Sequence, residues 1–406
     1  MSKVIIVGAG PAGATLAYLL ARAGIDVTLL ERETNFERVF RGEAMMPLGL
    51  EALEQMGIDI SPLPHRRVDS WDMHVANRLI FRVAEPQAEL GSRAVCVLSQ
   101  PAFLTHVTTL AQQFPNFRLL QGVTVRDLGV ENGRFTHISG THNGQPFTQT
   151  ADLIIGCDGR GSIVRTRADI KLNLLPESYD VLWFRFPAPP ALHGKTSVYL
   201  MGSVRNTALA YNSHDDHIRY ALLLPKGGYD RQRNWADELA EPAPPWLADH
   251  LQTVRGQIGE PSKLNVIVGR AASWHKPGLL LLGDAAHPMS PIRAQGINLA
   301  LRDVIVAANH LIPALQTTDT AIDQAAARIA AERLPEIQRA QALQLREARG
   351  QMNERWKPLL IAIAKTTAPL VGRYQWAQTA WLNQQHPLRF GTVPVKLRPH
   401  PQLETG

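Results

Sequence analysis

The chain has 406 residues, of which 45% are hydrophobic, and its 42 basic and 36 acidic residues give a formal charge of +6. This length is enough for about two to three domains with sizeable cores. The basic residues are scattered and no nucleic-acid motif is visible, so we expect no nucleic-acid partner. The charge fits an acidic ligand or a membrane surface, but it is more typical of an enzyme with a mildly basic surface.

The two cysteines, Cys96 and Cys157, are far apart and show no paired ligand spacing. We therefore expect neither a disulfide framework nor a cysteine zinc site, and no other metal site. No apolar run reaches the roughly 20 residues that a spanning helix needs. The N-terminal residues lead directly into a motif without a signal-peptide layout, so we expect a cytoplasmic protein.

The first motif has the order strand, glycine-rich turn, helix, strand and acid. The apolar run Lys3–Val7 predicts a buried parallel strand, and GAGPAG follows at 8–13. The alanine- and leucine-rich stretch 14–24 predicts a helix, Asp26–Leu30 a second strand, and Glu31 comes next.

Each part of this motif has a physical task in dinucleotide binding. Gly8 permits the tight turn, Gly10 lets a pyrophosphate approach the backbone, and Gly13 lets helix and strand pack closely. The helix N-terminus offers backbone N–H groups to the phosphates, and Glu31 stands where an acid binds ribose hydroxyls. The motif predicts a dinucleotide site without separating FAD from NAD.

Two further strands lead into conspicuous turns. The run 151–156 (ADLIIG) enters CDGRGSIVR, which by itself also fits an ordinary turn with a helix cap at Ser162. The run 278–282 enters GDAAHP, and a helix is predicted to begin near Gly296. Pro288 and Pro291 stiffen the loop before that helix.

Taken in this order, GAGPAG, DGRGSIVR and GDAAHP resemble the class A flavoprotein monooxygenases, the p-hydroxybenzoate-hydroxylase-like family, from Lys3 to about Gly350. The resemblance implies an α/β fold. A Rossmann-like FAD-binding domain of the GR2 type would be interleaved with an antiparallel-sheet substrate domain, and C-terminal helices would follow. We expect the FAD-binding domain at 1–67, 101–171 and 271–345, the substrate domain at 68–100 and 172–270, and the C-terminal helical segment at 346–406.

The resemblance also implies a set of site residues. Arg41 would lie near the flavin, although a surface salt bridge is an alternative, and Gln100 would contact FAD unless it is only a polar residue at a helix start. Asp284 would accept hydrogen bonds from the ribityl hydroxyls, the helix near Gly296 would face the flavin, and His287 would shape the loop. The cofactor-binding residues expected are Gly8, Gly10, Ala12, Gly13, Glu31, Arg32, Arg41, Gln100, Val123, Asp158, Asp284, Pro291, Gly296, Ile297 and Asn298.

The chain departs from the family pattern at Arg293 and Ala294, where relatives usually carry glycines. We expect Arg293 to reach the flavin edge or an anionic substrate group; the alternative is that it points to solvent or pairs with an acid. Arg41, Pro291 and Arg293 are the residues expected nearest the chemistry.

Alternating strand patterns at 68–84 and 179–270 predict hairpin-linked antiparallel strands. The resemblance implies that such a sheet roofs the flavin. Period-two alternation places Trp183 and Arg185 on one face and Phe184 and Phe186 on the other, and leaves open which face lines the pocket. Trp183, Arg185, Tyr199 and Tyr220 are the candidate substrate contacts, although each is also suited to a core position.

The implied function is an NAD(P)H-driven monooxygenase. NADPH or NADH would bind transiently and reduce FAD, and O2 would then supply one oxygen atom, through a flavin hydroperoxide, to an electron-rich aromatic or polyketide-like molecule. The alternatives are a reductase of the same fold, similar to prenyl-chain reductases, and a non-catalytic FAD-binding partner of a biosynthetic assembly.

The sequence also suggests how the chain associates. The stretch 323–353 predicts a long helix, and the tryptophan-rich, basic segment after it has an alternative role on a membrane surface. We favour packing of that segment on its own domain or on a partner, in a monomer or homodimer.

Overall fold

The computed structural model describes residues 2–37, 42–177, 179–230, 233–351, 359, 362 and 374–404. Within these ranges, a mainly parallel sheet has the strand order β20-β21-β12-β1-β2-β8. Only β20 and β21 pair in the antiparallel sense among the described strands of this sheet. Its strands are β1 (Lys3–Val7), β2 (Asp26–Leu30), β8 (Phe117–Leu120), β12 (Leu153–Gly156), β20 (His275–Lys276) and β21 (Leu279–Leu281).

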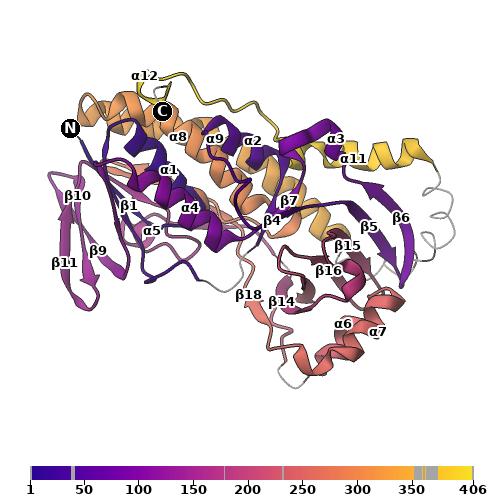
Figure 1. Cartoon of the computed structure of the whole chain (residues 1–406). Helices are drawn as coiled ribbons and strands as arrows, with labels where there is room; N and C mark the ends of the chain where they lie inside the picture. The colour runs from indigo at the N-terminus through magenta and orange to yellow at the C-terminus, as the bar shows by residue number, and fades with distance from the viewer. Residues whose placement is uncertain are drawn as a thin grey trace.

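Both faces of this sheet are covered because its central strands are apolar on both faces. Val4 and Ile6 belong to the same core as α1, α4 and α8, whereas Ile5 and Val7 pack into a second core on the other face. Figure 1 shows these helices side by side, with α9 along α8. The helices are α1 (Pro11–Arg22), α2 (Pro47–Gln55), α4 (Gln100–Gln112), α8 (Gln295–Ala314) and α9 (Asp319–Gln351).

A second large sheet, here called the substrate sheet, has the order β18-β14-β17-β16-β15-β5-β6. Its described pairs are antiparallel except that β15 runs parallel to β5, which comes from a segment more than 100 residues earlier. The sheet is therefore assembled from two separate stretches of chain. Its strands are β5 (Ser70–Val75), β6 (Arg78–Ala84), β14 (Tyr179–Pro187), β15 (Ser197–Gly202), β16 (Thr207–Asn212), β17 (His217–Pro225) and β18 (Ser262–Leu264).

Smaller elements complete the described fold. The strands β9 (Val123–Glu131), β10 (Arg134–His142) and β11 (Gln145–Thr150) form an antiparallel sheet at one end of the molecule (Figure 1). A small sheet of β3 (Ala44–Met45), β7 (Cys96–Leu98) and β4 (His65–Arg67) lies between the two large ones, and β13 (Leu172–Leu174) pairs with β19 (Gly269–Ala271). The remaining short helices are α3 (Gln87–Leu90), α5 (Ile163–Arg167), α6 (Trp235–Ala240) and α7 (Pro245–Thr253).

The C-terminal segment packs back on the chain. Helix α11 (Gln375–Phe390) lies beside β6, where the Trp381 ring is 6.2 Å from that of Trp71 and 5.7 Å from that of Phe81. Helix α12 (Pro401–Glu404) ends near α1, which brings the two termini together in Figure 1. Most of the basic tryptophan-rich segment, including 355–358 and 363–373, lies outside the described residues. Within the described part of the chain, no helix combines the length and the apolar character needed to cross a membrane.

Candidate functional site

The glycine-rich turn between β1 and α1 has the shape that a bound pyrophosphate needs. A side chain on Gly13 would overlap the carbonyl oxygen of Gly8, and Gly8, at φ +100°, lies against the carbonyl of Cys157. Gly10, by contrast, faces open space. Gly10 is also the N-cap of α1, where no side chain caps the helix, so the first backbone N–H groups of α1 are left for a ligand. The residues present therefore fit a diphosphate.

Glu31 and Val123 meet at the carboxyl end of β2. The backbone N–H of Val123 donates to the carbonyl of Glu31 at 2.9 Å, and both residues are buried. The Glu31 carboxylate accepts hydrogen bonds from the N–H groups of Ala9 (2.9 Å) and Glu33 (3.0 Å). This fixes the carboxylate next to the glycine-rich turn, as a ribose-binding acid requires. The side chain of Arg32, which was also expected at the cofactor, is 68% exposed and pairs with Glu33 at 2.9 Å.

The second and third motifs lie against each other although more than 100 residues separate them. Arg160 Nε is 3.2 Å from Asp284 Oδ2, and Arg165 Nη1 donates to the carbonyl of Ala285 at 2.8 Å. Asp158 accepts the N–H of Val164 with one oxygen, while its buried Oδ1 has no hydrogen-bond partner among the described residues. Burial raises the pKa of the Asp158 carboxyl. A buried carboxylate oxygen without a partner is the feature expected where a polar ligand completes a site.

His287, expected to shape the loop, lies in the protein interior. Its ring is fully buried, stacks on Trp274 at 4.9 Å between centroids, and places Nε2 2.6 Å from Asp303 Oδ2. Burial favours a raised pKa for Asp303, but His287 and Arg333 outweigh it and lower that pKa. Because Gly283 N–H also donates to Asp303, this acid on α8 anchors both ends of the loop 283–287.

The N-terminus of α8 presents backbone rather than side chains. The Asn298 amide accepts the N–H of Met46 (2.9 Å) and donates to the carbonyls of Ala44 (3.2 Å) and Ala294 (2.5 Å). With both ends of this amide engaged, Asn298 has only its backbone to offer a cofactor. Ala294, in the left-handed conformation at φ +52°, is the N-cap and provides no side-chain cap. This helix end therefore presents backbone N–H groups and the positive end of the helix dipole.

A small pocket beside this helix end joins residues that are far apart in sequence. Gln100 at the start of α4 and Ile297 at the start of α8, both expected at the cofactor, line it together, with Gly42 and Glu43 on another side. The remaining lining residues are Met45, Leu98 and Phe103. Arg41, expected next to Gly42, lies outside the described residues.

Arg293 does not extend toward an open site. Its Nε and Nη2 lie 3.1 and 2.8 Å from the two carboxylate oxygens of Glu347 on α9, and its Cζ is 5.6 Å from the centre of the Trp381 ring. The structure thus shows the pairing with an acid that was the alternative for Arg293, and the expected contact with the flavin edge or an anionic substrate group stays a prediction. Pro291 precedes it, at the start of the short 3-10 turn Ile292–Ala294 that leads into α8.

The structure settles which face of the substrate sheet is turned toward the loop 288–294 before α8, here called the flavin loop. Trp183 packs in the same cluster as Ile292 of that loop and lies edge-on to Tyr211, with 6.4 Å between ring centroids. Tyr199 and Tyr220 lie on the opposite face in a core shared with α6 and α7, where Tyr220 Oη donates to the carbonyl of Leu239. The interpretation of Tyr199 and Tyr220 as substrate contacts is therefore wrong, because the helices cover them. Arg185 is 55% exposed and pairs with Asp215 at 3.1 Å.

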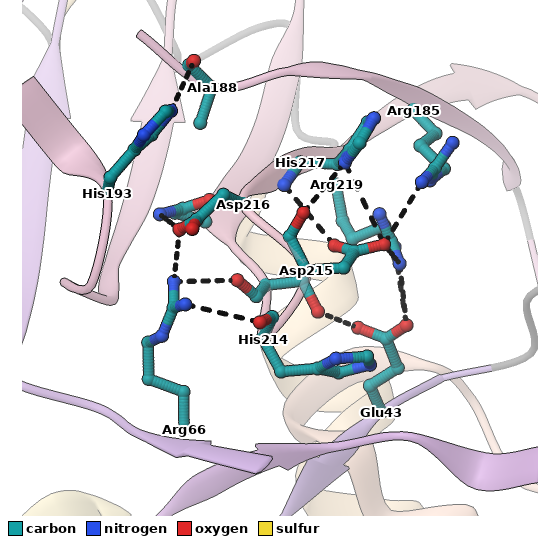
Figure 2. A network of polar contacts seen from close by, with 12 residues as sticks. Glu43, Arg66, Arg185, Ala188, His193, His214, Asp215, Asp216, His217 and Arg219 are labelled. Atoms are coloured by element: carbon teal, nitrogen blue, oxygen red, sulfur yellow. Dashed lines mark hydrogen bonds and ion pairs between the residues drawn. The ribbon is translucent and has the colours of Figure 1, made fainter. Parts of the chain in front are cut away.

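Sequence reasoning missed a network of charged residues at the end of this sheet. Figure 2 shows Glu43, Arg219, Asp215 and Arg185 in one chain of ion pairs, with Arg66 and Asp216 beside them. Arg219 is buried on β17, in the otherwise apolar stretch IRYALLL. A single arginine in an apolar strand could have indicated this network from the sequence, because a buried charge requires a partner of opposite charge.

Together these features describe a site for an extended dinucleotide. A glycine-rich turn precedes an uncapped helix at α1, the buried acid Glu31 follows β2, Asp284 follows β21, and the N-terminus of α8 has no side-chain cap. FAD has a diphosphate, a ribose, a polyol chain and a planar ring, and the residues present fit FAD.

Comparisons with known proteins agree with this geometry. A family model described as "FAD binding domain" matches residues 1–342. The 6-methylpretetramide 4-monooxygenase of Streptomyces rimosus is 34% identical over 86% of this chain and 84% of its own, and the p-hydroxybenzoate hydroxylase of Acinetobacter baylyi is 27% identical over 80% of each. Among solved structures, p-nitrophenol 4-monooxygenase from Pseudomonas putida superimposes with a TM-score of 0.76 at 18% identity, covering 97% of this chain and 100% of the other. That last likeness concerns the fold alone.

Proposed function

The chain belongs to the family of FAD-dependent aromatic monooxygenases, and from this premise we propose that it hydroxylates an electron-rich aromatic or polyketide-like molecule. The protein is a FAD-dependent oxidoreductase that uses NAD(P)H and O2. The comparisons do not favour the reductase or the non-catalytic alternative.

The observation that carries the substrate class is the inner face of the substrate sheet. Trp183 and Tyr211 lie edge to face there, next to Ile292 of the flavin loop, with Leu209 in the same apolar cluster. A wall of this kind suits a flat aromatic molecule, which gains from both burial and ring contacts. The relative named for 6-methylpretetramide makes that compound the first one to test.

Bound FAD supplies the redox chemistry when it takes electrons from NAD(P)H and activates O2. The chain's own residues have positioning tasks in this proposal. The Gly8–Gly13 turn and Glu31 would hold the dinucleotide end, Asp284 would hold the ribityl chain, and the N–H groups of 296–298 would stabilise negative charge on the ring. Trp183 and the apolar wall would exclude water from the reacting face.

We also propose the domain division set out from the sequence, a cytoplasmic location, and a monomer or homodimer with a small-molecule substrate. Support for packing of α11 on its own chain comes from Trp381 against Trp71 and Phe81, and from the buried ion pair of Arg389 with Glu85. A membrane-surface role is less favoured because these groups face the protein. Light scattering of the purified protein, with and without anionic lipid vesicles, would measure both the assembly and any membrane association.

The test of function is anaerobic reduction. The purified yellow protein is mixed with NADPH or NADH, and bleaching of the flavin is timed with and without 6-methylpretetramide, phenols and quinones. We expect one aromatic compound to accelerate bleaching and, once O2 is admitted, to yield a product with one added oxygen atom. A protein that neither nicotinamide bleaches in the presence of any of these compounds would contradict the proposal.

A matched pair of variants tests the substrate wall. Trp183→Ala is expected to raise KM for the aromatic substrate about tenfold, corresponding to the loss of about 1.4 kcal/mol of ring contact. Tyr199→Phe, on the covered face, is expected to leave KM unchanged. Equal effects of the two variants would show that Trp183 does not line the pocket.

A further inference from the structure

A buried ion pair links the loop beside the flavin pocket to the substrate sheet. Arg219 Nη2 is 3.0 Å from Glu43 Oε1, and the two side chains are only 7% and 8% exposed. The second carboxylate oxygen of Glu43 accepts the hydroxyl of Ser213 at 2.5 Å. Figure 2 shows Glu43 approaching Arg219 from the early part of the chain, whereas Arg219 and Asp215 come from the strand end above it. The contact joins positions 176 residues apart.

Arg219 is held from two sides. Its Nη2 is also 3.0 Å from Asp215 Oδ2, and Asp215 in turn pairs with Arg185. Burial favours a raised pKa for Asp215, but the hydrogen bonds from Arg219 and Arg185 outweigh it and lower that pKa to about 2. Asp215 therefore keeps its charge at neutral pH and fixes the orientation of the guanidinium toward Glu43.

The two ends of this pair lie at functionally different places. Glu43 follows Gly42 and lines the small pocket with Gln100 and Ile297. Arg219 pairs across the sheet with Tyr211, whose ring contacts Trp183 on the inner wall. Burial raises the pKa of Tyr211, and the charge of Glu43 adds to this effect. A continuous path of contacts thus runs from the substrate wall through Arg219 to the flavin-side loop.

We propose that the Glu43–Arg219 pair is a positioning contact that couples occupancy of the substrate wall to the placement of the loop at Gly42–Met45. The proposal rests on the function proposed above. A substrate that shifts Tyr211 or Trp183 would move Arg219, and Glu43 would transmit that movement to the pocket at Gln100 and Ile297. A buried pair of opposite charges suits this task, because a movement that separated the partners would leave both charges buried and unpaired.

A neighbouring pair on the same turn supplies a matched control. Arg66 Nη1 is 2.7 Å from Asp216 Oδ1, so it also ties the small sheet to the turn 213–216. Arg66 lies on β4, and neither Arg66 nor Asp216 lines the pocket at Gln100. If the turn 213–216 has only a structural role, breaking the Glu43–Arg219 pair and breaking the Arg66–Asp216 pair should affect the flavin equally. If the Glu43–Arg219 pair couples the two sites, only its loss should affect the flavin.

The first experiment uses the oxidised FAD-bound protein without nicotinamide. The substrate identified by the bleaching test is titrated while the visible flavin spectrum is recorded. For Glu43→Gln we expect the substrate Kd to change less than about twofold. We expect the spectral response of the flavin and the substrate-stimulated rate of flavin reduction to fall about tenfold, which is the change that about 1.4 kcal/mol of coupling produces. Asp216→Asn should keep the wild-type response.

A second measurement needs no cofactor. Amide hydrogen exchange at 42–46 should be accelerated in Glu43→Gln and in Arg219→Lys, because lysine cannot reach Glu43 and Asp215 with one planar group. It should stay unchanged in Asp216→Asn. Exchange at 42–46 that is unaltered in both Glu43→Gln and Arg219→Lys would overturn the proposal, as would equal loss of the spectral response in Asp216→Asn. If the wild-type flavin is not reduced by NAD(P)H, the proposed function fails, whereas the exchange result still decides whether the pair positions the loop.

Discussion

Substitutions of Arg293 separate two effects on stability, namely the strain of its left-handed backbone and the contacts of its side chain. Arg293 and Ala294 are both left-handed, at φ +59° and φ +52°, immediately before α8. A non-glycine residue there costs about 1 kcal/mol relative to glycine. The side chain of Arg293 offsets that cost through Glu347 and Trp381. Family members that carry glycine in this segment would need no such offset.

The magnitudes follow from burial. The Arg293 side chain is 12% exposed and Glu347 is 24% exposed, so their two-point ion pair is worth more than a surface pair, about 1–2 kcal/mol. The contact with Trp381 adds about 0.5–1 kcal/mol. Arg293→Ala loses these contacts and keeps the strained backbone, so it should lower the free energy of unfolding by about 2–3 kcal/mol. Arg293→Gly loses the same contacts but relieves the strain, so it should be about 1 kcal/mol more stable than Arg293→Ala.

Urea unfolding of the FAD-free protein, followed by circular dichroism, measures these differences, and flavin fluorescence measures FAD affinity in parallel. We expect FAD to bind Arg293→Gly more tightly than Arg293→Ala, because glycine keeps the loop in the conformation that leads into α8. Equal free energies of unfolding for Arg293→Gly and Arg293→Ala would show that the left-handed backbone is not strained. A free energy of unfolding equal to the wild-type value in both variants would show that the ion pair with Glu347 does not stabilise the protein.

Further predictions concern the nucleotide turn and the half-buried acid Glu177. Gly13→Ala should destabilise the FAD-free protein by about 2–3 kcal/mol, because its new methyl group overlaps the carbonyl of Gly8. Gly10→Ala should instead weaken FAD binding with little loss of stability, because Gly10 faces open space. Equal unfolding temperatures of the two FAD-free variants would contradict this prediction. Burial raises the pKa of Glu177 to about 7, an effect that Lys226 partly offsets. The contribution of this carboxyl to stability is then present below pH 4.5 and is lost as the pH rises to about 7. Glu177→Gln should therefore reduce the fall in unfolding temperature between these two pH values. A fall of the same size in the variant and the wild type would argue against the raised pKa.

The sequence by itself determined the parts of the site that depend on local backbone. The turn at Gly8–Gly13, the acid Glu31 and the helix start near Gly296 were all predictable, because strand periodicity, glycine spacing and helix signals act within about 20 residues. The order of the three motifs then identified the family. Domain boundaries and most side-chain roles at the cofactor remain predictions.

Only the tertiary structure decided which faces and which charges meet. Alternation along β14 separates Trp183 from Phe184, but both faces are apolar, so the pattern does not say which one α6 and α7 cover; that choice buried Tyr199 and Tyr220. The pairing of Arg293 with Glu347 and of Arg219 with Glu43 joins positions 54 and 176 residues apart. Such pairs form because a charge brought near the interior by packing must find its partner there, and sequence spacing carries no record of which partner that is.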